Sequence, residues 1–124
     1  MRRTANFLDD GMMIIEHLTM AVRPGDGERL ANALAYLSDR TLVLRGCLSC
    51  RLSREIADEG TLDLEVRWAS KDDLIRHLQS ETYKQFLFLM ELSAAPPTLQ
   101  FFSVKEMQGL ELVRIARSSS YARP

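Results

Sequence analysis

Hydrophobic and polar residues alternate along four stretches of the chain, a pattern typical of half-buried β-strands. The stretches cover residues 12–22, 47–54, 62–68 and 99–104. Between the second and third stretches, Asp58 and Gly60 favour a turn, so this pair predicts an antiparallel hairpin. A fifth apolar stretch, residues 110–115, follows Gly109 and predicts a further short strand that extends the sheet or reaches another subunit.

Apolar residues recur at helical spacing in two segments between these strands. The first segment begins after Asp26, a predicted N-cap, and Gly46 is predicted to stop it. The second follows Ser70, which is spaced to form a capping box with Asp73, and ends before Pro96. Its predicted buried stripe comprises Leu74, Ile75, Leu78, Thr82, Phe86 and Leu89.

The resulting order is strand, helix, strand, strand, helix, strand. It predicts an α+β domain of the ferredoxin-like, split βαβ type, an antiparallel sheet with both helices on one face. A chain of 124 residues fits one domain. We assign it residues 12–116, after an N-terminal arm (1–11) and before a polar tail (117–124). The other sheet face carries mixed charges, and we expect a second copy to cover it, giving a homodimer.

The distribution of charge and the lengths of the apolar stretches limit which partners the chain is expected to bind. The 16 basic and 17 acidic residues are spread along the chain and leave a net charge of -1, which provides no basic stripe for nucleic acid. The apolar stretches are far shorter than the roughly 20 residues of a membrane span, and residues 4–10 form no secretory signal. The sequence therefore predicts a cytoplasmic protein that binds neither nucleic acid nor membrane.

The two cysteines, Cys47 and Cys50, form a lone CxxC at the start of a predicted strand. Residues three apart in a strand point to opposite faces, which disfavours both a disulfide and a shared metal. We interpret both as structural residues and expect no metal site.

Trp68, the only tryptophan, and His77 are the main candidates for chemistry. An indole can form the flat wall against which an aromatic ligand stacks, or it can fill the core where a strand meets a helix. A histidine can remove a proton near neutral pH, or it can lie on a helix surface bonded to a neighbour. Because Ser70 caps the helix directly after Trp68, His77 lies about 10 Å along it and can lean back toward the strand.

We expect Trp68 and His77 to line one cavity between the sheet and the second helix. The alternate positions of the third strand are charged, so Leu64 and Val66 share the helix-covered face with Trp68. The predicted apolar walls and substrate contacts are Leu64, Val66, Leu74 and Phe88. His17, on the first strand, either lines the same pocket or lies at the dimer interface.

Several segments together resemble the antibiotic biosynthesis monooxygenase family of small dimeric α/β-barrel proteins. They are VRPGDGERL, LRGCLSCRLSRE, LEVRWASKDDLIRHLQSETYKQF and the Ala95-Pro96-Pro97 triplet. The resemblance covers residues 12–113, and its strongest part is Trp68 followed by a capped helix with His77 and Ser80. It implies a homodimer with a pocket in each subunit. In some members it also implies oxygenation of quinols, polyketide phenols or haem without a bound metal or flavin.

This sequence also departs from the family's patterns. Haem-degrading members carry an asparagine on the first strand, and residues 12–22 contain none. Members that oxidise polyketide phenols carry an asparagine where this chain has Leu64, and many have a glutamate where it has Val66. Two function classes therefore remain. One is a cofactor-independent monooxygenase acting on a hydroxylated aromatic or quinol; the other is a non-catalytic homodimeric module that binds a small ligand or assembles.

Overall fold

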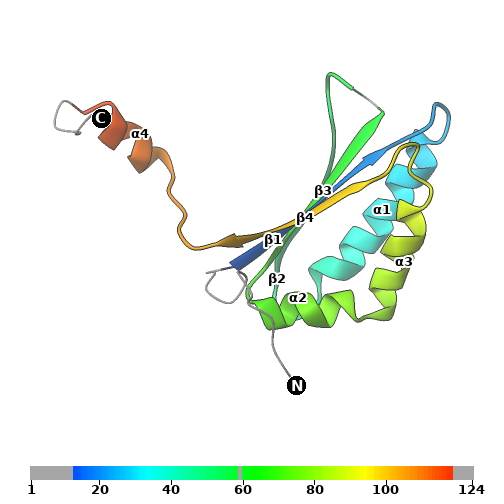
Figure 1. Ribbon diagram of the computed structural model, residues 1–124, viewed down its shortest axis with the longest axis horizontal. Helices are drawn as coiled ribbons and strands as arrows, with labels where there is room; N and C mark the ends of the chain where they lie inside the picture. Colours follow the sequence, from blue (N-terminus) through cyan, green and yellow to red (C-terminus); the bar gives the residue numbers. More distant parts are fainter. Residues whose placement is uncertain (1–12, 59, 119–124) are drawn as a thin grey trace.

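A four-stranded antiparallel sheet covered on one face by helices organises the computed structural model, which describes residues 13–58 and 60–118. The strands are β1 (Met13–Ala21), β2 (Cys47–Arg54), β3 (Thr61–Trp68) and β4 (Thr98–Val104), in the order β2-β3-β1-β4. Three helices, α1 (Gly27–Leu42), α2 (Lys71–Leu78) and α3 (Glu81–Met90), lie on the same side of this sheet (Figure 1). The predicted ferredoxin-like α+β fold is confirmed.

The hydrophobic core fills the space between the sheet and the helices. Alternate residues of β1 and β3 point into it, as their periodicity predicts, because successive strand side chains face opposite sides of a sheet. Burying each large apolar side chain stabilises the fold by about 1.5–3 kcal/mol. The core includes Ile14, Leu18 and Met20 from β1, Leu62, Leu64, Val66 and Trp68 from β3, and Leu34, Leu37, Leu74 and Phe86 from the helices.

The segment predicted as one long helix is two short helices. The Ser80 hydroxyl accepts a hydrogen bond from the backbone N–H of Tyr83 and so caps a new helix, α3. The predicted cap of α2 is present, since the Ser70 hydroxyl accepts from the Asp73 N–H. The break lets α2 pack on β1 and β3 while α3 packs on α1. Ile75, predicted to be buried, is exposed.

The predicted opposite orientation of the two cysteines is wrong because β2 contains a β-bulge. Cys47 pairs with Trp68 and Cys50 pairs with Val66, although the cysteines are three positions apart and their partners only two. Leu48 is the extra residue and is exposed. Both cysteines therefore face the core side, where they are free thiols packed against the hydrophobic core.

The turn between α1 and β2 contains Gly46, in the left-handed region at φ +84°. Helix α1 ends at Leu42, so Gly46 shapes the turn rather than the last helical residue. The Gly46 carbonyl accepts a hydrogen bond from the Ala69 N–H, and its Cα faces the Asp73 side chain at the start of α2. This glycine therefore ties the end of β3 to the start of β2.

The prediction of a strand over 110–115 is wrong: the segment is a helix, α4 (Leu110–Ala116). Its apolar residues do not alternate, and Glu111 and Arg114 form an i,i+3 ion pair on the helix surface. Helix α4 stands apart from the sheet at the end of an extended arm that continues β4 (Figure 1). Its apolar side chains are exposed: Leu110, Leu112, Val113 and Ile115.

Across 13–58 and 60–118, none of the helices has both the length and the apolar character needed to cross a membrane. The predicted N-terminal arm, residues 1–11, lies outside the described residues, as do residues 119–124 of the predicted tail.

Candidate functional site

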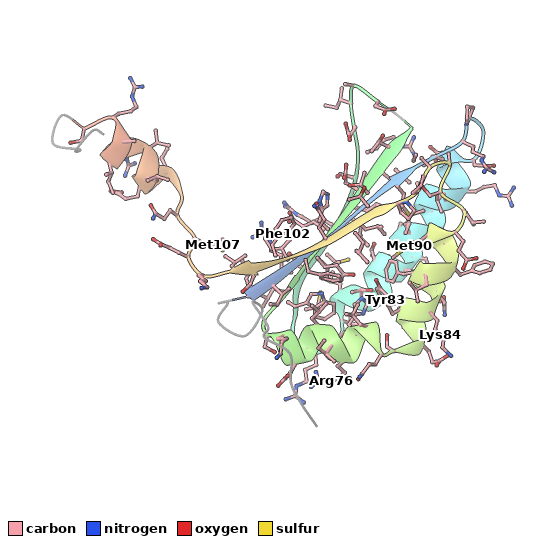
Figure 2. The ribbon with its side chains drawn as sticks, viewed as in Figure 1. Arg76, Tyr83, Lys84, Met90, Phe102 and Met107 are labelled. Atoms are coloured by element: carbon pink, nitrogen blue, oxygen red, sulfur yellow. The ribbon has the colours of Figure 1, made fainter. Side chains whose placement is uncertain are left out.

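A buried cluster of polar and aromatic side chains lies where β1, β3, α2 and α3 meet. It consists of Glu16 from β1, Trp68 from β3, His77 from α2, and Tyr83 and Phe86 from α3. Figure 2 shows Tyr83 and Met90 on the sheet side of α3, whereas Arg76 and Lys84 point outward. The two short helices thus present their inner side chains to the end of β3.

Trp68 is completely buried, and its indole is anchored by a hydrogen bond. Nε1–H donates to Oε1 of Glu16 at 3.1 Å. Trp68 lies on the core face of β3 and Glu16 lies on the core face of the adjacent strand β1. A buried indole N–H needs a partner, and a carboxylate oxygen is a strong acceptor.

His77 lies in the interior rather than on the helix surface, with 3% of its residue surface exposed. Its ring is tilted against the Trp68 ring with centroids 4.7 Å apart. The Tyr83 and Phe86 rings meet it edge-on at 5.1 and 6.0 Å. The predicted proximity of Trp68 and His77 is therefore present, and both rings are closed off from solvent.

The two nitrogens of His77 have different surroundings. Nε2 lies 3.8 Å from Oε1 of Glu16. Nδ1 is buried and has no hydrogen-bond partner among the described residues. Buried polar atoms are nearly always paired, so this unpaired nitrogen is available to accept or donate a hydrogen bond within the cluster.

Burial controls the ionisation of the cluster. Desolvation raises the pKa of Glu16 to about 7, although the hydrogen bond from Trp68 lowers it. Desolvation also lowers the pKa of His77 to about 4 and raises the pKa of Tyr83 to about 12. At 3.8 Å Glu16 and His77 are close enough for an ion pair, but desolvation outweighs their attraction. Near pH 6 the pair is therefore a carboxylic acid beside a neutral imidazole.

The predicted apolar walls divide into two groups. Leu64, Val66 and Leu74 are buried on the core side with Trp68 and surround the cluster. Phe88 does not belong to it: 65% of its surface is exposed, and it lines a groove between α1 and α3 with Tyr36. The prediction of Phe88 as a wall is therefore wrong, because Tyr83, Phe86 and Met90 are the α3 residues that face the core.

His17 lies on the opposite face of the sheet from Trp68. Its Nε2 is 3.0 Å from Oδ1 of Asp63, which also accepts a hydrogen bond from the Thr19 hydroxyl at 2.7 Å. Together with Arg51, it borders a hollow on this open face. Of the two predicted locations for His17, the pocket with Trp68 is wrong, and the dimer interface stays a prediction.

Glu16 and Tyr83 are the members of the cluster that the sequence reasoning missed, and Glu16 is the one that carries a charge. It stands between Ile14 and Leu18 on the core face of β1, where the alternation places only apolar residues. A lone carboxylate on an otherwise apolar strand face is the signal that could have identified it, because a buried charge requires partners. Across the described residues, no group of three or more potential ligands is placed to hold a metal ion.

The family profile described as antibiotic biosynthesis monooxygenase matches residues 13–87, more than half of the chain. This match covers every member of the buried cluster. The chain therefore belongs to the antibiotic biosynthesis monooxygenase family, as the sequence resemblance indicates.

Solved structures of other proteins have the same fold. A Caulobacter crescentus protein, provisionally named an antibiotic biosynthesis monooxygenase, is 23% identical with a TM-score of 0.71, and the match covers 80% of this chain and 95% of the other. A Bordetella bronchiseptica protein of the same provisional name is 26% identical with a TM-score of 0.62, covering 75% and 96%. A conserved Methanosarcina mazei protein is 20% identical with a TM-score of 0.70, covering 81% and 100%. A search of curated proteins found no match.

Proposed function

We propose that this protein is a cofactor-independent monooxygenase that acts on a small hydroxylated aromatic compound, such as a quinol, at the Trp68–His77 cluster. The observation that carries the proposal is the unpaired, buried Nδ1 of His77 beside the Trp68 ring. An aromatic hydroxyl placed there would find both a hydrogen-bond partner and a stacking surface. The family and the provisional names of two structural neighbours support this reaction class.

The reaction requires a phenolate, because the anion transfers an electron to dioxygen far more readily than the neutral phenol. His77 removes the hydroxyl proton as the general base. One oxygen atom then forms a new carbon–oxygen bond at a ring carbon that loses hydrogen, and the other leaves as water. The phenol becomes a quinone and supplies all the electrons, so the proposal requires neither a metal nor a flavin.

Substrate access requires movement, since Trp68 and His77 are closed to solvent in this conformation. The segment Gln79–Ser80 between α2 and α3 is the short connection nearest His77. Displacement of α2 about this connection would open the cluster while leaving the sheet intact. Such closure would also exclude water from the reacting phenolate.

Oxygen uptake with a panel of quinols and phenols tests the proposal. We expect substrate-dependent uptake by the purified protein that persists after chelator treatment. Changing His77 to Ala should reduce it by roughly 10²-fold or more, the usual scale for losing a general base. Phe88→Ala, on the exposed groove, is the matched control and should leave uptake unchanged. No uptake with any compound would refute the oxygenase function.

Burial of the cluster favours a second candidate, a non-catalytic module that retained the fold. Trp68, His77 and Glu16 would then serve packing alone, and neither asparagine pattern of the oxygenating relatives is present. A protein that binds aromatic compounds in a thermal-shift titration without consuming oxygen would support this candidate over the first.

We also propose that the protein is a homodimer whose open sheet faces pack together. On the open face of β4 and β1, exposed Phe102 pairs with half-buried Ile15 beside the charged positions of β3. Figure 2 shows Phe102 on the side of the sheet away from the helices. The exposed apolar residues of α4 lie beyond this face on the arm and would reach the partner. Exposed apolar patches of this kind mark interaction sites.

A further inference from the structure

We infer that His77 and Glu16 form a two-residue proton relay in which His77 passes a proton from Nδ1 to Nε2 and Glu16 stores it. The inference rests on the proposed function for the source of the proton, a substrate hydroxyl. It goes further by placing the proton acceptor on β1, at a residue that lies behind His77. Glu16 acts through His77, so it is a positioning and proton-storing residue.

The geometry places Glu16 directly behind the imidazole. Oε1 of Glu16 lies 3.8 Å from Nε2 of His77, and this separation must shorten to hydrogen-bond length for the proton to pass. The same oxygen accepts the Trp68 Nε1–H at 3.1 Å. Trp68 is fully buried in the core, and its indole N–H holds the carboxylate beside His77.

The second ring nitrogen of His77, Nδ1, would be the one that meets the substrate. A carboxylate beside Nε2 favours the neutral tautomer with its hydrogen on Nε2, which leaves a lone pair on Nδ1. Nδ1 has no partner among the described residues, although it is buried. A hydroxyl bound there would donate to Nδ1, while Nε2–H donates to Glu16. The imidazole would thus connect the substrate hydroxyl to the carboxylate.

The titratable groups whose pKa values the charge of Glu16 raises suit proton storage. They are the thiols of Cys47 and Cys50 from β2 and the phenol of Tyr83 from α3, which all stay neutral near pH 7. Burial brings the pKa of Glu16 to about 7, so its carboxylate is available at neutral pH and binds a proton readily. The pKa of His77, about 4, means that the imidazole does not retain one.

The step balances in bonds and charge. The substrate O–H bond breaks as an Nδ1–H bond forms, and the Nε2–H bond breaks as an O–H bond forms on Glu16. The phenolate gains the negative charge that the carboxylate loses. His77 remains neutral and changes only its tautomer, which avoids a charged imidazolium in the apolar core.

The pH profile of oxygen uptake, measured for the wild-type protein, Glu16→Gln and Glu16→Asp, tests the relay. Wild-type uptake should rise through about pH 7 as Glu16 ionises. Glu16→Gln should lose about 10²-fold and lose this rise. Glu16→Asp should recover part of the rate with an altered profile. Glu65→Gln, which removes a carboxylate from the open face of β3, is the control and should match wild type. Unchanged uptake and profile in Glu16→Gln would overturn the relay while leaving the oxygenase function intact.

NMR titration of the Glu16 carboxyl carbon and the His77 ring nitrogens tests the relay without any substrate. We expect Glu16 to titrate near pH 7 and the hydrogen of neutral His77 to lie on Nε2 when Glu16 is ionised. This result would support the relay even if no compound supports oxygen uptake, in which case the proposed reaction alone fails. Titration of Glu16 at an ordinary carboxyl pKa, or of His77 near neutrality, would overturn the relay.

Discussion

Glu16 accepts a hydrogen bond from the indole of Trp68, a residue 52 positions away in the sequence, and both side chains are buried at the same end of the sheet. This contact determines how a carboxylate is held within an apolar core. It also couples the packing of Trp68 to the ionisation of Glu16, and through it to His77.

Replacing Trp68 with Phe removes this hydrogen bond but keeps an aromatic ring. We expect a loss of about 1–3 kcal/mol in unfolding free energy, because a buried carboxyl group loses its partner. The pKa of Glu16 should rise further, since the Trp68 hydrogen bond lowers it. A higher folded-state pKa means that the extra destabilisation grows as pH rises above 7. Urea denaturation at pH 5 and pH 8 measures both effects. Equal losses at the two pH values would contradict the coupling.

Opposite pH dependences should appear when Glu16 and His77 are replaced separately. Burial raises the Glu16 pKa from 4.5 to about 7, so Glu16 destabilises the fold as pH rises through this window. Burial lowers the His77 pKa from 6.5 to about 4, so His77 destabilises the fold as pH falls through that window. Relative to wild type, Glu16→Gln should gain stability from pH 4.5 to 7, and His77→Phe from pH 6.5 down to 4.

Chemical denaturation across this pH range gives the unfolding free energy of each variant relative to wild type, and its slope against pH. In the wild-type protein the two contributions largely cancel between pH 4.5 and 6.5, so its own stability should change little there on their account. An ion pair of a carboxylate with an imidazolium would reverse both slopes, and that outcome would contradict the neutral pair described here.

Gly46 should be the glycine least tolerant of substitution. It combines a positive φ of +84° with a Cα whose added methyl group would collide with the Asp73 side chain. Gly25 has a positive φ but open space around it, and Gly109 has neither constraint. Gly25→Ala should therefore cost about 1 kcal/mol from backbone strain alone. Gly46→Ala should cost clearly more and Gly109→Ala close to nothing in thermal unfolding. Equal effects at positions 25 and 46 would show that the Asp73 contact is unimportant.

The proposed dimer predicts that a charge on the open sheet face, at Phe102 of the edge strand β4, separates the subunits. Phe102→Glu should yield monomers in sedimentation velocity at micromolar concentration, because it buries a carboxylate in an apolar contact. Leu87→Glu places the same charge on the exposed, helical side of the molecule and should leave the dimer intact. A wild-type monomer at this concentration would contradict the dimer outright.

The strands and the first cap of the helical segment after β3 could be predicted from the sequence, because each depends on residues close together in the chain. The four strands and the cap at Ser70 needed only alternation and one short-range hydrogen bond. The break at Ser80 was missed because apolar spacing continues across it, although a serine can cap a helix wherever the chain turns. Residues 110–115 were predicted as a strand from their apolar content alone, and their helical pairing of Glu111 with Arg114 was overlooked.

The site was less accessible from the sequence, since its members come together through tertiary contacts. Trp68 and His77 were identifiable as residue types and by the short connection between them. The role of Glu16 required knowledge of the tertiary contact with Trp68, because Glu16 lies opposite Val66 in the β1–β3 register and only its side chain reaches the Trp68 indole. The placement of Phe88 failed because it depended on the course of the chain after Ser80. The bulge at Leu48 likewise reversed the orientation expected for Cys47.

Turnover under isotopically labelled dioxygen tests the central claim most directly. The protein, treated with chelator and freed of bound flavin, is mixed with a quinol that supports oxygen uptake, and the product is analysed by mass spectrometry. We predict one labelled oxygen atom per product molecule, one dioxygen consumed per substrate, and loss of the labelled product in the His77→Ala protein. Product without label, or labelling that persists in His77→Ala, would contradict the account.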